Sequence, residues 1–390
     1  MKLHIFNPEN DLALADGGFS YCPPPAAMCI ANELASLQLW YAHVEDAVLL
    51  PDDLHLTFRE EMSSLFNLPH AYTASMQSLI TNLSPWGWSA QMRHRLKSMG
   101  FDQAMLPDDE SIASMRLLSS RVLTIEVLTA LRDAGIDTPP LPLYINNIDD
   151  AVAFVNSHER CVVKAPWSGS GKGIMWGIGS AEEPMVNFCR GVIRRQGGVV
   201  CEHYLNAKAE FAMEFFAGEN GVEFAGYSLF TAENGAYTGN LLAANEYIEE
   251  QLSQYIPLEL LTAVKTELCT VMHGVLAKSG YRGYFGVDMM IYDNGDGYCL
   301  NPCMEVNLRM NMGVVSRLFH DRFVYKGKHG IYRVRFFKQP GEAYSSHHEM
   351  KDAYPLIVDN GRVVRGYMNL VPVTPENRYL AYAIIGEDIC

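Results

Sequence analysis

The sequence lacks the features that mark membrane-spanning, exported and nucleic-acid-binding proteins. Its longest apolar runs, such as residues 26–30 and 381–385, are far too short to span a bilayer. Residues 1–11 contain no long apolar segment and no cleavage pattern, so we expect no signal peptide. Basic residues are scarce, since 30 Lys and Arg stand against 45 Asp and Glu and leave a net charge of −15. Because nucleic acids and anionic membranes are bound by clustered Lys and Arg, we expect neither as a partner.

A disulfide framework is also missing. The nine cysteines are an odd number without regular spacing, which is typical of free thiols in a reducing compartment. Cys299 and Cys303 flank Pro302, and their spacing does not suit a zinc site. We therefore expect a cytoplasmic protein.

Length and hydropathy patterning predict several α/β units. The 390 residues are 48% hydrophobic, enough for two or three packed domains. Strand-like and helix-like segments alternate without internal repeats, so the predicted fold class is α/β, with residues 1–112 as a small first domain. One helix is expected over residues 117–135, and residues 237–240 are expected to form a turn before a helix.

The strongest functional pattern lies in residues 281–313. The segment alternates as a strand, turns at residues 293–297 and returns as a second strand. Its polar positions are Asp288 on the first strand and Glu305, Asn307 and Arg309 on one face of the second. Apolar neighbours place the hairpin in a core, where carboxylates are costly unless they are paired or bound to a metal. A solvated hairpin is the alternative, but these oxygens suit Mg²⁺, which commonly accompanies a nucleotide polyphosphate, with the guanidinium as an anion clamp.

A glycine-rich loop follows the strand predicted at residues 161–165. Glycines let backbone N–H groups approach phosphate oxygens, and lysines add positive charge. The candidate phosphate-binding residues are Lys164, Ser168, Gly169, Ser170, Gly171, Lys172 and Gly173. The loop is not a Walker A motif, because Pro166 occupies the position of the first glycine and Gly173 replaces the final Ser or Thr. A surface loop without a ligand remains the alternative.

Taken in order along the chain, four motifs resemble the ATP-grasp superfamily. They are residues 119–121 followed by 134–139, the strand and loop of residues 162–173, residues 201–205 with Glu210, and Asp288 with the E-x-N-x-R sequence of residues 305–309. The resemblance covers residues 112–317, roughly half of the chain. Two departures stand out: Arg121 occupies the place of a usual Lys, and Pro302 predicts a bulge or short loop in the return strand.

The resemblance implies two subdomains, residues 113–200 and 201–330, that clamp ATP. Residues 331–390 have no match in the family, and their short strand-like segments predict a β-rich extension. The resemblance also implies ATP and Mg²⁺ as cofactors, with Mn²⁺ as an alternative metal. The implied contacts are Glu202, His203 and Leu205 to adenine, Glu210 to ribose, Arg121, Lys164 and the glycine-rich loop to phosphates, and Asp288, Glu305 and Asn307 to the metal.

The implied activity is that of an ADP-forming C–N ligase, which activates a small-molecule carboxylate as an acyl phosphate and couples it to an amine of an amino acid or peptide. Arg309 would face the acceptor as a catalytic residue, with Arg282 as a second candidate and Asn311 and residues 237–240 as weaker ones. The alternatives are a kinase acting on a hydroxyl group and a nucleotide-binding module without catalysis.

The first domain resembles the one that helps ATP-grasp enzymes bind their second substrate. The acidic segment Glu9, Asn10 and Asp11 would then face an amine, or else cap a helix. A homodimer is common for this architecture and is left open.

Overall fold

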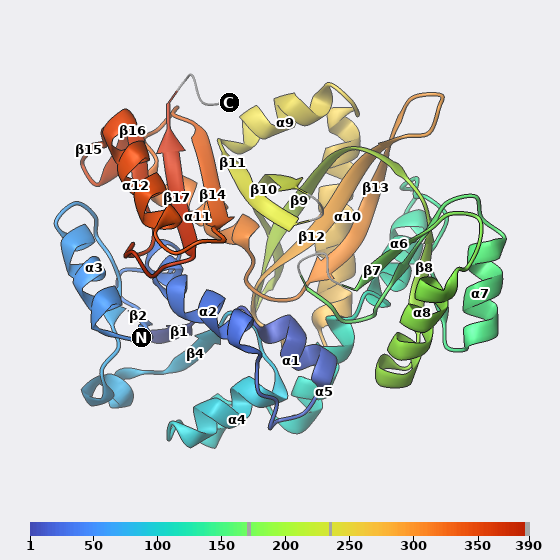
Figure 1. The fold of residues 1–390 in the computed structure, drawn as a ribbon, viewed down its shortest axis with the longest axis horizontal. Coiled ribbons are helices and arrows are strands. Elements are labelled where there is room, and N and C mark those ends of the chain that lie inside the picture. Colours follow the sequence, from blue (N-terminus) through green and yellow to red (C-terminus); the bar gives the residue numbers. More distant parts are fainter. Residues whose placement is uncertain (170–172, 234–235, 387–390) are drawn as a thin grey trace.

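The computed structural model describes residues 1–169, 173–233 and 236–386, and its strands form three sheets within those ranges (Figure 1). The mixture of helices and sheets confirms the α/β fold class. Among the helices of the described residues, none has both the length and the apolar character needed to cross a membrane.

The first sheet belongs to the N-terminal domain. Its parallel strands are β1 (Lys2–Ile5), β2 (Ala47–Val48), β3 (His70–Ala71) and β4 (Asn82–Pro85), in the order β3-β2-β1-β4. The accompanying helices are α1 (Asn10–Asp16), α2 (Pro25–Glu33), α3 (Asp53–Ser63) and α4 (Ala90–Ser98), with 3₁₀ helices at Ala35–Trp40, Ala74–Leu79 and Gln103–Met105. The strand order reverses between β1 and β4, where ligands of open α/β sheets commonly bind. Asn7 links the two strand ends, since its side chain donates to the Gly87 carbonyl at 2.9 Å and accepts from the Gly87 N–H at 3.3 Å.

The second sheet is antiparallel and lies apart from the first. Its strands are β5 (Leu143–Ile145), β6 (Cys161–Lys164), β7 (Ile174–Gly177) and β8 (Val199–His203), in the order β5-β8-β6-β7. Helices α7 (Ile148–Asn156) and α8 (Glu183–Gln196) pack on one face of this sheet, and α5 (Asp109–Leu118) and α6 (Leu123–Asp133) precede it.

The third sheet has nine antiparallel strands in the order β13-β12-β9-β10-β11-β14-β17-β16-β15. They are β9 (Asn206–Gly218), β10 (Gly221–Glu233), β11 (Ala236–Leu242), β12 (Gly283–Asp293), β13 (Tyr298–Asn307), β14 (Gly330–Phe336), β15 (Ile357–Asp359), β16 (Arg362–Asn369) and β17 (Tyr379–Ile385). The remaining helices are α9 (Asn245–Ser253), α10 (Leu258–Leu276), α11 (Met312–Phe323) and α12 (Glu342–Ala353). Because β14 pairs with β11, the C-terminal strands continue the central sheet.

Alternation along the central strands separates a core face from a polar face. Phe211, Met213 and Phe215 of β9 pack with α10 in the largest apolar core, together with odd-numbered residues of β12. The even-numbered residues of β9 and β12 therefore point to the opposite face, where Asp288 lies.

The N-terminal domain shares a second core with the C-terminal part of the chain, and Figure 1 shows these blue and red segments side by side. Trp40 stands at its centre, in edge-to-face contact with Phe319 and Phe323 of α11. Its indole N–H donates to the Leu370 carbonyl at 2.7 Å. This packing fixes the loop after β1 relative to the end of β13.

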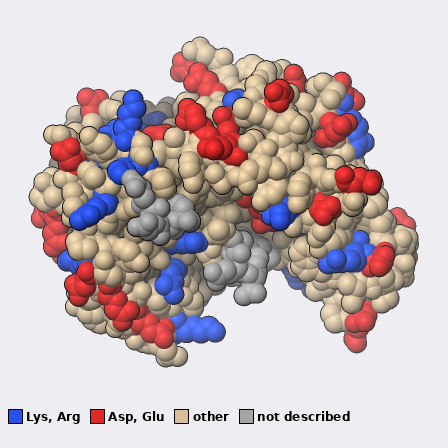
Figure 2. All heavy atoms as spheres, turned by 90° about the horizontal axis from the view of Figure 1, so that it is seen from above, with Lys and Arg blue, Asp and Glu red and all other residues tan. Residues whose placement is uncertain are grey.

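Figure 2, seen from above, shows acidic and basic side chains interspersed over one face of the molecule.

Two local predictions were wrong, and one helix was not predicted. Residues 237–240 belong to strand β11 and do not form a turn. The single helix expected over residues 117–135 is broken between α5 and α6, because the Arg121 N–H donates to the Pro166 carbonyl at 2.9 Å and leaves the helical pattern. Helix α12 lies where the sequence gave no helical expectation.

Candidate nucleotide and metal site

The β12–β13 hairpin brings polar residues of its two strands together. Asp288 pairs with Glu305, and Gly286 pairs with Asn307. The pairing shifts between Asp288 and Met290, which lies opposite Asn301, so the extra residues around Pro302 form the predicted bulge. The bulge leaves the two carboxylates facing each other across the hairpin.

Asp288 carries the most informative electrostatics of this cluster. Burial, and next the negative charge of Glu305, together raise the pKa of its carboxyl to about 7, while a hydrogen bond from Asn307 acts in the opposite direction. That bond, from Nδ2 of Asn307 to Oδ2 of Asp288, is 3.0 Å long. Two carboxylates and an amide oxygen on neighbouring strands are ligands that suit a divalent cation. Within the described residues, no group of three or more His, Cys, Asp or Glu side chains is arranged to hold a metal, so other oxygens would have to complete the coordination.

Arg121 is buried between this cluster and the glycine-rich loop. Its Nη2 lies 3.0 Å from Oε2 of Glu305. Its Nη1 donates to the Ala165 carbonyl at 2.9 Å and to Oγ of Ser168 at 2.5 Å. A single guanidinium thus connects the predicted metal site to the loop that precedes β7.

The glycine-rich loop is described only at its two ends. Gly173 has a φ of 81°, which favours glycine, and its carbonyl accepts a hydrogen bond from the Ala165 N–H at 2.8 Å. Gly169 lies against the N-terminal domain, since a Cβ there would come within 2.7 Å of Oδ2 of Asp11. The predicted phosphate contacts Ser170, Gly171 and Lys172 lie outside the described residues.

The predicted adenine and ribose residues lie near the connection between β8 and β9. Lys164 of β6 and Glu202 of β8 form a mostly buried ion pair, with Nζ and Oε2 2.6 Å apart. Leu205 lies in the connection itself, and His203 ends β8 with its ring 4.6 Å from that of His158. Burial raises the pKa of Glu210 on β9, and the charge of Lys164 counteracts this, so the two groups share one electrostatic environment.

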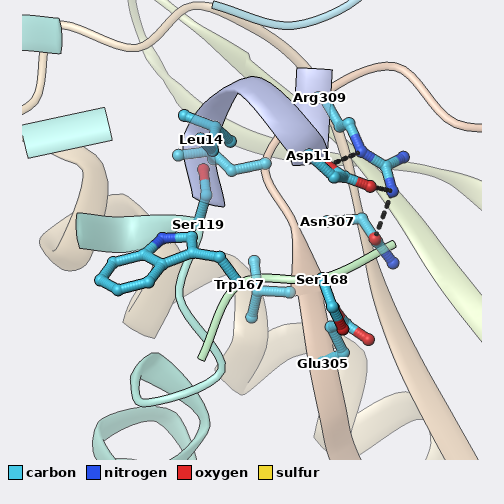
Figure 3. A pocket seen from close by; sticks show the side chains of 10 residues that line it. Asp11, Leu14, Ser119, Trp167, Ser168, Glu305, Asn307 and Arg309 are labelled. Atoms are coloured by element: carbon cyan, nitrogen blue, oxygen red, sulfur yellow. Dashed lines mark hydrogen bonds and ion pairs between the residues drawn. The ribbon is translucent and has the colours of Figure 1, made fainter. Parts of the chain in front are cut away.

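Arg309 lies at the end of β13 and holds a residue of the N-terminal domain. Its Nε and Nη2 donate to Oδ1 and Oδ2 of Asp11, both at 2.7 Å. Nη2 also donates to Oδ1 of Asn307 at 3.1 Å, which ties this ion pair to the predicted metal cluster. Figure 3 shows the three side chains converging. They line a cavity of about 10 Å³, enough for one water molecule, which Trp167, Ser168 and Glu305 also border.

Arg282 is the predicted catalytic residue that the structure does not bring to this cluster. Its side chain is exposed, and its Nη1 donates to the carbonyl of the adjacent Tyr281 at 2.7 Å. The weaker candidate Asn311 caps α11 and donates to Oε2 of Glu214 at 2.8 Å.

Sequence reasoning missed Glu214, which lies on the polar face of β9. Only 1% of this residue is exposed, and burial raises the pKa of its carboxyl to about 8. Gly286 and Gly313 make room for it, because a Cβ at either position would come within 2.5 Å or less of its carboxylate oxygens. Glu214 and Glu210 lie four residues apart on one strand, so their side chains point to the same face. This spacing was the signal in the sequence that could have marked Glu214 as a site residue.

These features define a class of fold. The second sheet, the β8–β9 connection and the β12–β13 hairpin form the ATP-grasp fold, as the four motifs predicted. The sequence itself matches no protein-family model and no curated protein.

Particular solved structures share this fold. An N5-carboxyaminoimidazole synthetase from Staphylococcus aureus in complex with ADP has 13% identity and a TM-score of 0.50, covering 100% of this chain and 94% of its own. An Aspergillus clavatus N5-carboxyaminoimidazole synthase with ADP and 5-aminoimidazole ribonucleotide has 10% identity and a TM-score of 0.50, covering 99% and 94%. A biotin carboxylase–β-γ-ATP complex from Campylobacter jejuni has 11% identity and a TM-score of 0.52, covering 99% and 87%.

Proposed function

We propose that this chain is an ATP- and Mg²⁺-dependent ligase that couples a carboxylate to an amine and forms ADP and phosphate. The observation that carries the proposal is the cluster of Asp288, Glu305 and Asn307 on the ATP-grasp hairpin, with Arg309 beside it. The similar solved structures support it, because two of them are complexes with ADP and one is a complex with β-γ-ATP.

The metal site follows from the charge of the cluster. Asp288, Glu305 and Asn307 would hold Mg²⁺, or Mn²⁺ in its place, and the triphosphate of ATP would supply further oxygens. The bound cation would offset negative charge on the β- and γ-phosphates during phosphoryl transfer. Burial and then the charge of Glu305 raise the pKa of Asp288, and a cation bound between the two carboxylates would offset their repulsion.

The nucleotide would lie between the second and third sheets. Lys164, Arg121 and the glycine-rich loop would hold its phosphates, and Glu210 would hold its ribose. Glu202, with His203 and Leu205, would contact adenine. Glu202 also holds Lys164 in place through their 2.6 Å ion pair, so nucleotide binding would have to accommodate that pair.

The reaction would proceed in two steps. An oxygen of the acceptor carboxylate attacks the γ-phosphorus of ATP, the bond to the β–γ bridging oxygen breaks, and ADP leaves with the electron pair. The amine then attacks the acyl carbon, phosphate departs, and the nitrogen loses a proton. Arg309 would stabilise negative charge on the acceptor.

The proposal extends to the organisation of the chain. Residues 1–112 would help to bind a substrate, residues 113–200 and 201–330 would clamp ATP, and residues 331–390 would extend the central sheet. All eight cysteines of the described residues are free thiols, which supports a cytoplasmic location.

The test is formation of ADP and phosphate from MgATP in the presence of paired libraries of carboxylates and amines. Asp288→Asn and Glu305→Gln are expected to lower turnover at least about 100-fold, and Asp296→Asn in the exposed hairpin turn is the matched control. Full turnover in Asp288→Asn would contradict the assigned metal site. A phosphorylated hydroxyl product formed without an amine would identify a kinase, and ATP binding without any turnover would identify a non-catalytic module.

A further inference from the structure

Asp11 pairs with Arg309 in the same way that the carboxylate of a bound ligand would. Both carboxylate oxygens accept hydrogen bonds from the guanidinium at 2.7 Å, the two-pronged geometry in which Arg recognises carboxylates. The two residues are 298 positions apart, and Asp11 comes from helix α1 of the N-terminal domain. The chain itself therefore fills the place beside the metal cluster where an acceptor carboxylate would bind.

The surroundings leave no room for both carboxylates. The adjoining cavity of about 10 Å³ holds no more than one water molecule. Gly169 of the glycine-rich loop lies against the same carboxylate, since even a Cβ at this position would come within 2.7 Å of Oδ2 of Asp11. Figure 3 shows the residues that line the cavity. An acceptor can reach Arg309 only if the Asp11 carboxylate moves off it.

Displacement by a simple anion would leave Asp11 without a cation. Its side chain is only 21% exposed, and Glu305 borders the same cavity. Among the described residues that line the cavity, Arg309 is the one basic side chain. The nearby guanidinium of Arg121 is already engaged, because it pairs with Glu305 at 3.0 Å. A partly buried carboxylate that loses its partner is costly, so a ligand that brings its own cation would bind better.

We propose that the acceptor is a zwitterion of the α-amino acid type, whose carboxylate replaces Asp11 on Arg309 and whose ammonium group pairs with the displaced Asp11. The exchange conserves charge at the site, because one internal ion pair becomes two ion pairs to the ligand. Asp11 is thus the residue that selects acceptors with an ammonium group. This inference rests on the proposed ligase function and names its substrate class.

A hydroxylamine-trapping assay isolates the acceptor. Hydroxylamine replaces the unknown amine and converts any acyl phosphate into a hydroxamate with release of phosphate. The probes are L- and D-α-amino acids, each matched with its N-acetyl derivative and with the carboxylic acid that lacks the amino group. With the wild-type protein and MgATP, the free amino acid of at least one set is expected to exceed both of its analogues by about 10-fold or more in kcat/KM.

Asp11→Asn is expected to reduce this preference about 10-fold. KM for the amino acid should rise, because its ammonium group loses the Asp11 carboxylate. KM for the analogue without the amino group should fall, because Arg309 is then no longer held by a carboxylate. If Asp11 had only a structural role, the substitution would raise KM for both substrates alike. Asp16→Asn, at an exposed position of the same helix, is the matched control.

The outcomes separate this inference from the ligase proposal. Hydroxamates formed equally well or better from the analogues by the wild-type protein would overturn the zwitterion inference and leave the ligase function standing; this comparison needs no variant. An equal loss for both substrate types in a folded Asp11→Asn protein would also overturn it. Hydroxamate from no carboxylate of any kind would overturn both.

Discussion

Glu214 provides the most quantitative prediction of this structure. Its carboxyl is buried among Asn311, Gly286 and Gly313, and burial raises its pKa from 4.5 to about 8. At pH values between these two, the unfolded chain has released this proton and the folded chain still holds it. Folding therefore binds a proton in this range, and the contribution of Glu214 to the free energy of unfolding falls as pH rises from about 4.5 to about 8.

The size of the effect follows from the shift. At about 1.4 kcal/mol per pKa unit, the loss over this range amounts to roughly 5 kcal/mol. That figure is an upper bound, because the N-terminus of α11, capped by Asn311, lies against the carboxylate and favours its ionised form.

Glu214→Gln removes the ionisation and keeps an oxygen that can accept the hydrogen bond from Asn311. Thermal unfolding of the variant and the wild type is expected to coincide near pH 5. By pH 8.5 the midpoint of the variant should be higher, on the order of 5 °C. Glu219→Gln, at an exposed position in the β9–β10 turn, is the control and should follow the wild type at every pH. A difference between Glu214→Gln and wild type that does not change with pH would refute the reasoning.

Two further predictions concern the nucleotide site. Lys164→Met should lower the affinity for ATP by about 10-fold or more in titration calorimetry, because it removes a phosphate partner and leaves Glu202 unpaired. Combining it with Glu202→Gln should cost less stability than the sum of the two single changes. Additive losses would show that the two residues of the 2.6 Å ion pair are not energetically coupled. Arg121→Lys keeps the positive charge, but a lysine cannot reach Glu305, Ser168 and the Ala165 carbonyl together. Thermal unfolding should therefore show that the free energy of unfolding falls by about 1–3 kcal/mol, and KM for ATP should rise. An unchanged KM would show that Arg121 does not contact the phosphates.

The hairpin of residues 281–313 could be predicted from the sequence alone. Alternation with period two and a turn rich in glycine predicted both strands, because the strands and their turn are contiguous in the chain. The register shift between Asp288 and Met290 then places Asp288 opposite Glu305. Pro302 likewise predicted the bulge, since proline cannot donate to a strand ladder. The order of four motifs was enough to predict the ATP-grasp fold.

Patterns that depend on distant partners were not decided locally. Residues 237–240 have turn-forming composition, yet pairing with β10 and β14 makes them a strand. The break before α6 depends on a hydrogen bond from Arg121 to Pro166, 45 positions along the chain. In both cases tertiary hydrogen bonds outweigh a weak local preference.

Which charges meet depends on the packing of segments that are distant in the chain. The sequence marked Arg309 and Asp11 as separate candidates, but their ion pair exists because the N-terminal domain packs against α11 through Trp40 and brings α1 to the end of β13. Glu214 is hidden from sequence reasoning for a similar reason, because its burial comes from Gly286 and Gly313, which lie 72 and 99 positions away. Alternation within a strand assigns a side chain to a face, whereas its partners and its ionisation depend on the segments that the fold packs against that face.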